Sequence, residues 1–253
     1  MDLTGKVVLV TGAARGIGQE YVRALGLAGA SMVAADVISC DETVALAGTA
    51  GVKAIGIKLD VTDMASAQAA ADAAMSTFGR LDGLINNAAL YGTLKGGRFD
   101  TLSESDWDAA MAVNVKGIWQ CCKAAVPYMR KGGGGSIINI SSLAASYGTP
   151  YVLHYATSKA AVGGMTRALA RELGRDRIRV NAISPSAVLT PATDEFFADK
   201  RDVALETVRK MQAIQTNLKP ADLAGTALWL LSDASQFITG QTIAVDGGTA
   251  MHG

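Results

Sequence analysis

The run Thr11-Gly12-Ala13-Ala14-Arg15-Gly16-Ile17-Gly18, close to the start of the chain, decides the fold. It follows residues 6–10, a short apolar stretch that predicts a buried strand, and precedes residues 19–28, which have a pattern of helical period. A glycine turn between a strand and a helix is typical of dinucleotide-binding loops, because glycines let the backbone approach a pyrophosphate at the helix start. We therefore expect a nucleotide site here; a tight turn that binds no ligand is the alternative.

Outward from this loop, apolar strand patterns alternate with helical patterns. The predicted strands cover residues 7–10, 31–35, 54–59, 83–86, 136–140, 179–183 and 242–245. The predicted helices after the first cover residues 63–78, 106–129, 155–173 and 220–231. This alternation favours an α/β fold with a doubly wound parallel sheet, flanked by helices on both faces. No break resembles a linker, so we expect a single Rossmann-like domain over residues 1–253.

Four consecutive glycines, Gly132 to Gly135, offer a second candidate for a phosphate loop. They precede a predicted strand, whereas a phosphate loop precedes a helix. A surface turn is the better interpretation.

Composition excludes several classes of function. The 253 residues are 49% hydrophobic and 18% charged, with a net charge of zero, and no basic stripe indicates a nucleic-acid partner. No apolar run reaches the roughly 18 to 20 residues of a membrane span, and the chain opens on a strand without a signal peptide. The three cysteines, Cys40, Cys121 and Cys122, have no framework spacing, which favours the reducing cytoplasm. Two histidines without a cysteine cluster predict no metal site.

A candidate catalytic group lies in the second half of the chain. Tyr155 and Lys159 are one helical turn apart on a predicted helix, and Ser142 precedes the tyrosine by thirteen residues. A nearby ammonium should lower the pKa of the phenol, which could then exchange a proton with an alcohol near neutral pH. Ser141 competes with Ser142 for the substrate oxygen, but successive residues leaving a strand point in opposite directions.

Polar residues follow the predicted strands at the carboxyl edge of the sheet, where ligands bind in such folds. Asp36 ends the second strand, about twenty residues beyond the glycine turn, where an acid accepts hydrogen bonds from the ribose and repels a 2′-phosphate. It predicts NAD as the cofactor. Arg15 favours NADP instead, since a basic side chain in the turn can pair with that phosphate. An ordinary loop acid is the alternative interpretation of Asp36.

Together these motifs resemble the short-chain dehydrogenase/reductase family over essentially the full chain. The landmarks that carry the resemblance occur in the family's order: Thr11 to Gly18, Asp60-Val61, Asn86-Asn87-Ala88, Asn114, Ser142, Tyr155 with Lys159, Asn181, Pro185, Thr190 and Asp246-Gly247-Gly248. The chain departs from the family at Ala89 and Ser186, where glycine is commoner; we expect both departures to be tolerated.

The resemblance implies nicotinamide chemistry on an alcohol or carbonyl, with residues 1–150 mainly binding the cofactor. It assigns catalysis to Asn114, Ser142, Tyr155 and Lys159, with Asn114 supporting a water-linked proton relay. A buried asparagine satisfied by helix carbonyls is the alternative. Beyond Asp36, the implied cofactor contacts are Gly12, Arg15, Gly16, Ile17, Gly18, Asp60, Val61, Asn87, Ala88, Ala89, Tyr155, Lys159, Pro185, Val188 and Thr190.

The resemblance implies that the substrate contacts the loop after Ala89, the stretch around Leu143–Tyr151 and the segment after Thr190. The last of these predicts a helical lid over residues 190–216. Apolar and aromatic side chains dominate these segments, although any one of them could simply pack the lid: Tyr91, Leu94, Leu143, Tyr147, Tyr151, Phe196 and Phe197. A hydrophobic pocket with one polar focus suits an uncharged secondary alcohol or ketone. Residues 185–190 and 237–242 also resemble the family's NAD-dependent secondary-alcohol dehydrogenases of the 1-phenylethanol dehydrogenase type.

Three other functions compete with this prediction. An NADPH-dependent 3-oxoacyl-thioester reductase would want a base in place of Asp36, and a sugar or polyol dehydrogenase a more polar lid. A non-catalytic nucleotide-binding scaffold would not need the catalytic group. The resemblance further implies a homotetramer, with long amphipathic helices pairing the subunits.

Overall fold

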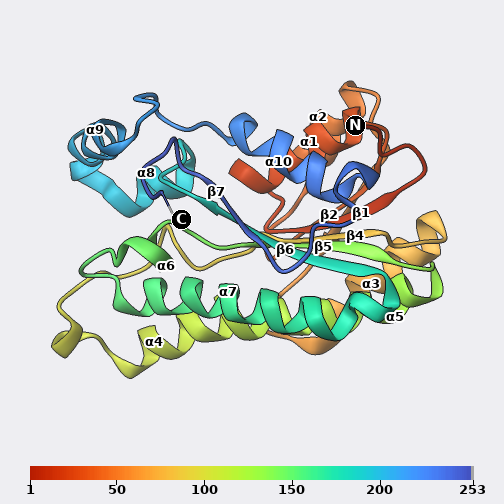
Figure 1. Cartoon of the computed structure of the whole chain (residues 1–253), viewed down its shortest axis with the longest axis horizontal. Coiled ribbons are helices and arrows are strands. Elements are labelled where there is room, and N and C mark those ends of the chain that lie inside the picture. The colour runs from red at the N-terminus through yellow and green to blue at the C-terminus, as the bar shows by residue number, and fades with distance from the viewer. Residues whose placement is uncertain (252–253) are drawn as a thin grey trace.

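The computed structural model describes residues 1–251 and contains one seven-stranded parallel sheet (Figure 1). Its strands are β1 Val7–Thr11, β2 Ser31–Asp36, β3 Ala54–Lys58, β4 Gly83–Asn86, β5 Gly135–Ile140, β6 Ile178–Pro185 and β7 Thr242–Val245. They lie in the order β3-β2-β1-β4-β5-β6-β7, and every paired register is parallel. The order reverses between β1 and β4, and ligands bind at such a switch point.

All seven predicted strands are confirmed, with ends that differ by at most two residues. The central strands are readable from sequence because both of their faces are covered, which makes them continuous apolar runs. Every residue of β1 is buried, whereas exposed positions recur along the edge strands β3 and β7.

Helices cover both faces of the sheet (Figure 1). One layer contains α1 Gly16–Leu27, α2 Asp41–Thr49 and α10 Pro220–Leu231; the other contains α3 Met64–Phe78, α5 Gly117–Lys131 and α7 Leu153–Leu173. Successive residues of β1 pack into different cores, since Val8 and Val10 belong with α1 and α10, and Val7 and Leu9 with α3 and α5. This alternation confirms the doubly wound, single-domain prediction.

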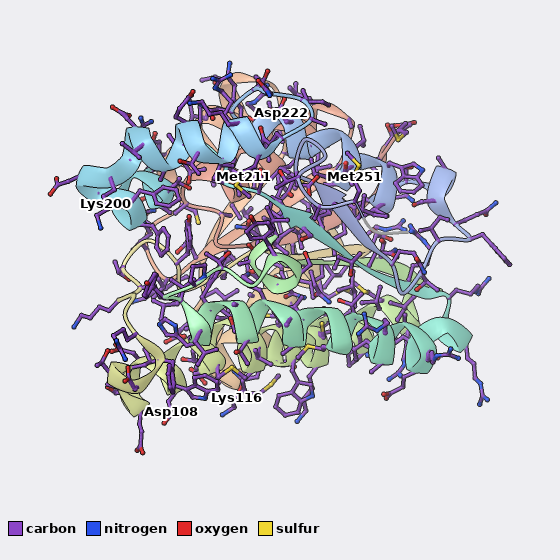
Figure 2. All side chains as sticks on the ribbon, turned by 60° about the vertical axis from the view of Figure 1, so that its left-hand side comes forward. Asp108, Lys116, Lys200, Met211, Asp222 and Met251 are labelled. Carbon is purple, nitrogen blue, oxygen red and sulfur yellow. The ribbon has the colours of Figure 1, made fainter. Side chains whose placement is uncertain are left out.

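The helix predicted over residues 106–129 is longer and less regular than expected. It consists of α4 Glu104–Met111, a π-helical turn Ala112–Lys116 and α5. Asn114 lies in this π-helical turn. Single π-helical turns within α-helices occur often at functional sites, because they re-aim side chains locally. Figure 2 shows Asp108 of α4 and Lys116 on the layer opposite Lys200 and Asp222.

The predicted lid is helical but broken. It contains α8 Pro191–Phe197, a 3-10 turn Ala198–Lys200 and α9 Arg201–Met211. Ala198 has a φ of 43°, a left-handed conformation that ends α8. These segments lie with α6 Ala144–Tyr147 at one end of the sheet (Figure 1), while Lys200 and Met211 mark the lid in Figure 2.

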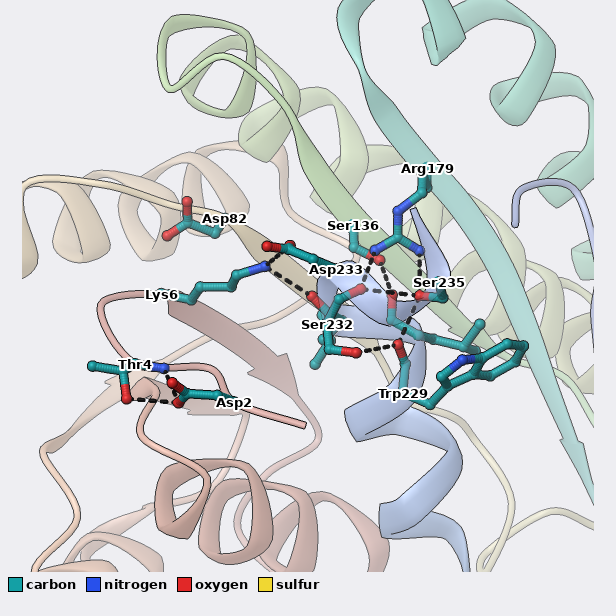
Figure 3. Close-up of polar contacts among 12 residues, drawn as sticks. Asp2, Thr4, Lys6, Asp82, Ser136, Arg179, Trp229, Ser232, Asp233 and Ser235 are labelled. Carbon is teal, nitrogen blue, oxygen red and sulfur yellow. Dashed lines mark hydrogen bonds and ion pairs between the residues drawn. The ribbon is translucent and has the colours of Figure 1, made fainter. Parts of the chain in front are cut away.

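Polar contacts tie α10 to the amino ends of the strands (Figure 3). Lys6 Nζ lies 2.6 Å from Asp233 Oδ1, in the 3-10 turn Asp233–Ser235, and Arg179 donates to Ser235 Oγ at 2.9 Å. Ser136 Oγ donates to the carbonyl of Leu230 at 2.7 Å. This edge is opposite to the carboxyl ends of the strands and is stabilised by its own network. Two further 3-10 turns cover Phe99–Thr101 and Gly174–Asp176. Within residues 1–251, no helix is both long and apolar enough to cross a membrane.

Candidate active site

A cavity of about 700 Å³ lies at the carboxyl ends of the strands. Its lining comes from the loops after β1 to β6, from α7, and from the lid. Residues of both halves of the chain therefore meet there, including the segment 185–193 that lies beyond the predicted cofactor half. The volume falls within the roughly 300 to 1,000 Å³ of ordinary ligand sites.

The glycine loop after β1 adopts the geometry that its sequence predicts. Gly12 has a φ of 66° and Gly16 a φ of 61°. A Cβ on Gly12 would lie 2.8 Å from the Ala88 Cα, and one on Gly18 would lie 2.1 Å from the Gly12 carbonyl oxygen. Larger residues would therefore push the loop apart. The first turn of α1 has no side-chain cap, which leaves its N–H groups available for an anion, and Gly16 and Ile17 of this turn line the cavity.

Asn87 secures this loop to the end of β4. Its side-chain amide donates to the carbonyls of Thr11 and Gly12, each at 3.0 Å. The Thr11 hydroxyl in turn accepts from the backbone N–H groups of Asn87 and Ala88, each at 3.0 Å. Asn87 thus shapes the loop through its side chain, although it also lines the cavity.

Two acids line the part of the cavity beside β2 and β3. Asp36 accepts from the backbone N–H of Ala14 at 3.0 Å and from that of Ile38 at 3.3 Å. Asp60 accepts from both the N–H and the hydroxyl of Thr62, and these hydrogen bonds lower its pKa. Val61 and Ile17 also line the cavity.

Tyr155 and Lys159 face the cavity from successive turns of α7. The Lys159 nitrogen lies 5.8 Å from the centroid of the Tyr155 ring and donates to the carbonyl of Ile140 at 2.8 Å. The side chain of Lys159 is therefore held between the tyrosine and the end of β5. The predicted convergence of the tyrosine, the lysine and the glycine loop on one cavity agrees with this geometry.

The pKa of Tyr155 differs from the prediction. Burial raises it above its ordinary value, Tyr91 adds to this increase, and a hydrogen bond with Ser142 acts in the opposite direction. Burial also lowers the pKa of Lys159 to about 8. The expected lowering of the phenol pKa by Lys159 is not met in this structure, because desolvation raises the pKa and Ser142, not Lys159, is the group that lowers it.

The two candidate serines both line the cavity, but they have different hydrogen-bond partners. Ser142 lines the cavity next to Tyr155, and its Oγ accepts from the N–H of Ala144 at 3.2 Å. Ser141 Oγ donates to the carbonyl of Lys159 at 2.9 Å. Ser142 is thus the serine that can hold a substrate oxygen, while Ser141 fixes the helix that carries the lysine.

Asn114 is buried beside the cavity and does not line it. Its Oδ1 accepts from the N–H of Leu90 at 2.7 Å, and its Nδ2 donates to the Leu90 carbonyl at 3.3 Å and to Ser158 Oγ at 3.0 Å. These contacts occupy the side chain. Through them Asn114 connects the loop after β4 to α7. Its part in a proton relay stays a prediction.

Four predicted substrate residues line the cavity near Tyr155: Tyr91, Leu143, Phe196 and Phe197. Tyr91 lies 4.6 Å from the Phe196 ring and 5.3 Å from the Tyr155 ring, between centroids. Burial raises the pKa of Tyr91 to about 12, with a hydrogen bond to Thr193 opposing it. An aromatic wall therefore joins the lid to the catalytic tyrosine.

Three predicted substrate residues lie outside the cavity. Tyr147 and Tyr151 are exposed, and Leu94 is buried elsewhere. Hydrophobic character alone predicted them, and it cannot distinguish a pocket wall from the outside of a lid. Sequence reasoning missed Thr193 and Val208, which do line the cavity. The Thr190-Pro191 cap could have located Thr193, because the Thr190 side chain accepts from its N–H at 3.2 Å.

Ala88, Ala89, Pro185, Val188 and Thr190 also line the cavity. Gly18, predicted to contact the cofactor, does not line it and packs instead against the Gly12 carbonyl. The departure at Ser186 has a role in the structure, since its hydroxyl lies 3.0 Å from the side-chain amide of Gln212 at the end of the lid. Among residues 1–251, no three His, Cys, Asp or Glu side chains group closely enough to hold a metal ion.

Comparison with known proteins identifies the family to which this fold belongs. A family model described as enoyl-(acyl carrier protein) reductase matches residues 12–250. The 3-oxoacyl-(acyl-carrier-protein) reductase of Thermotoga maritima is 38% identical over 98% of this chain and 99% of its own. D-threitol dehydrogenase of Mycolicibacterium smegmatis is 38% identical over 97% and 93%. The chain belongs to the short-chain dehydrogenase/reductase family.

A solved structure adds information on the cofactor. The 3-ketoacyl-(acyl-carrier-protein) reductase of Brucella melitensis, complexed with NADH, superposes with a TM-score of 0.89 at 32% identity, over 99% of this chain and 100% of that one. The residues of this chain fit a nicotinamide dinucleotide as well. The glycine loop leaves room for a pyrophosphate, Asp36 lines the cavity as a candidate acceptor for ribose hydroxyls, and Lys159 lies buried beside Tyr155 in the same cavity.

Proposed function

We propose that the protein is an NAD-dependent dehydrogenase that interconverts an uncharged secondary alcohol and its ketone. One observation carries this proposal: the hydroxyl groups of Tyr155 and Ser142 lie in a cavity with an aromatic wall. That wall is formed by Tyr91, Phe196 and Phe197. The four charged residues lining the cavity are Arg15, Asp36, Asp60 and Lys159, all at positions proposed to bind the cofactor. The substrate end thus offers aromatic surface and hydroxyl groups, and it has no charged side chain outside the positions proposed to bind the cofactor.

The reaction follows from these groups. In the oxidation direction, the Tyr155 phenolate accepts the proton of the substrate hydroxyl while Ser142 donates a hydrogen bond to the same oxygen. The carbinol C–H bond breaks as the C=O bond forms, and a bound nicotinamide dinucleotide supplies the hydride acceptor. Lys159 stabilises the phenolate electrostatically. In the reverse direction the phenol returns the proton.

Asp36 supports NAD over NADP. Its carboxylate lines the cavity at the end of β2, where it would accept hydrogen bonds from the adenosine ribose and repel a 2′-phosphate. We also propose a cytoplasmic location, which the three free, buried cysteines support.

An NADPH-dependent 3-oxoacyl-thioester reductase is the second candidate, because the Thermotoga relative is named a 3-oxoacyl-(acyl-carrier-protein) reductase and the Brucella structure a 3-ketoacyl-(acyl-carrier-protein) reductase. Asp36 disfavours it, as does the absence of a basic residue among the residues lining the substrate end. A polyol dehydrogenase, as the name of the Mycolicibacterium relative indicates for that protein, would need more hydrogen-bonding groups opposite Tyr155 than the aromatic wall provides.

The test is to measure NAD reduction with aryl, alicyclic and aliphatic secondary alcohols, both enantiomers of each, and with polyols. Apolar secondary alcohols should give the highest kcat/KM. Tyr155→Phe should lower kcat by about a hundredfold to ten-thousandfold, since it removes the group that transfers the proton. NADH binding, measured by fluorescence titration, should stay nearly unchanged. Retained turnover in Tyr155→Phe, or a preference for polyols or acyl thioesters, would contradict the proposal.

A further inference from the structure

An ion pair links the glycine loop to the lid. The Arg15 guanidinium and the Glu195 carboxylate form two parallel hydrogen bonds, with 2.9 Å between Nη2 and Oε2 and 2.5 Å between Nη1 and Oε1. Arg15 precedes α1, and Glu195 lies in α8, 180 residues later in the chain. Such fork-to-fork geometry fixes the direction of the guanidinium as well as neutralising its charge.

The ion pair packs against the loop that follows β4. Gly92 lines the cavity, and a Cβ at that position would lie 2.4 Å from the Oε2 of Glu195 and 3.1 Å from the carbonyl oxygen of Ala192. The carboxylate of Glu195 therefore packs directly on Gly92. Three segments, the glycine loop, the loop after β4 and the lid, meet at the rim of the cavity.

Arg15 is also the cation that an NADP site would need. Only Arg15 and Lys159 are basic among the residues lining the cavity, and Lys159 is buried beside Tyr155. An arginine near the end of β2 is the group that accommodates a 2′-phosphate in NADP-binding relatives of this fold. In this structure the carboxylates of Glu195 and Asp36 both raise the pKa of Arg15 and so favour its charged form. The Glu195 carboxylate also accepts hydrogen bonds from the guanidinium.

We propose that Glu195 is a specificity-determining residue: by holding Arg15 at the lid, it withholds the guanidinium from a 2′-phosphate and disfavours NADP. The inference rests on the proposed NAD-linked function and adds a second acid, on a different element, to the discrimination by Asp36. A 2′-phosphate must compete with Glu195 for the same donors. Selectivity gained by such competition needs no tighter contact with NAD.

Glu195→Gln tests this, because it keeps the size of the side chain and removes its charge. Dissociation constants for NADH and NADPH are measured by fluorescence titration, which requires no substrate. The variant should bind NADPH about fivefold more tightly, the effect of an exposed ion pair, with NADH changed less than about twofold. Asp36→Ser should shift the same ratio, and the double variant should shift it further.

Glu206→Gln is the matched control. Glu206 pairs with Arg209 and Lys210 within α9 and does not line the cavity, so its variant should behave as the unaltered protein. Adding Arg15→Met to Glu195→Gln should abolish the gain in NADPH affinity. An unchanged ratio in Glu195→Gln, equal changes for both dinucleotides, or a gain that persists without Arg15 would overturn the inference. If the unaltered protein bound neither dinucleotide, the proposed function itself would fail.

Discussion

At the scale of the residue, the buried charge of Lys159 lowers the stability of the fold at a position proposed to take part in the reaction. Its side chain is 2% exposed, and burial lowers its pKa to about 8 from an ordinary 10.5. Its one hydrogen bond in the structure, to the Ile140 carbonyl, offsets only part of the desolvation. Residue identity and spacing predicted its nearness to Tyr155. They could not predict the raised phenol pKa, because desolvation depends on everything packed around the pair.

Replacing this lysine should stabilise the fold while destroying activity. At pH 7 the depressed pKa corresponds to a cost of up to about 3 kcal/mol, since each pKa unit is worth about 1.4 kcal/mol. Lys159→Met should therefore raise the melting temperature by several degrees at pH 7. Unfolded protein binds more protons than folded protein between pH 8 and 10.5, so the stability of the unaltered protein rises across that window and the difference shrinks.

Calorimetry at pH 7 and pH 10 checks this expectation. Lys53→Met, which changes an exposed lysine, should leave the melting temperature unchanged at both values. A Lys159→Met protein that is less stable than the unaltered one at pH 7 would show that the buried ammonium is fully compensated.

At the scale of the element, the π-helical turn between α4 and α5 aims Asn114 at Leu90 and Ser158. The amphipathic pattern predicted one continuous helix there, since one extra residue in a turn leaves little trace in a pattern of helical period. The family landmark located the asparagine. The finding that its side chain holds the loop bearing Tyr91 required the three-dimensional arrangement.

Asn114→Leu should weaken substrate binding. The Leu90 N–H would lose its partner, at a cost of roughly 1 to 3 kcal/mol in unfolding free energy, and the loop before Tyr91 would loosen. We expect a higher KM for the alcohol together with a lower melting temperature. Asn139→Leu is the control: Asn139 is equally buried and bonded to Asn86 and Thr166, away from the cavity lining. It should lower stability without raising KM. The same KM increase in both variants would refute a positioning role.

At the scale of the whole molecule, the predicted homotetramer needs apolar surface, and the protein has it on two different elements. Trp119 on α5 is 46% exposed, and Phe237, before β7, is 99% exposed. Exposed large apolar side chains on separate surfaces are what paired interfaces would cover.

Light scattering on the purified protein should give four copies, and Trp119→Glu should reduce the assembly to dimers by placing a charge in one interface. Val203→Glu, at an exposed apolar position on the lid helix α9, should leave the mass unchanged. A monomeric unaltered protein would rule out the tetramer.

The sequence by itself determined the sheet, its two helical layers and the glycine loop, because these follow from local apolar runs, from backbone freedom at Gly12 and Gly16, and from the close packing that glycine allows at position 18. It also determined which edge of the sheet carries the site, since the carboxyl ends of parallel strands lie together. Only the tertiary structure decided the pKa of Tyr155, the exclusion of Tyr147 and Tyr151 from the cavity, and the Arg15–Glu195 pair. Each of these depends on desolvation or on contacts between segments up to 180 residues apart, and no local pattern encodes such contacts.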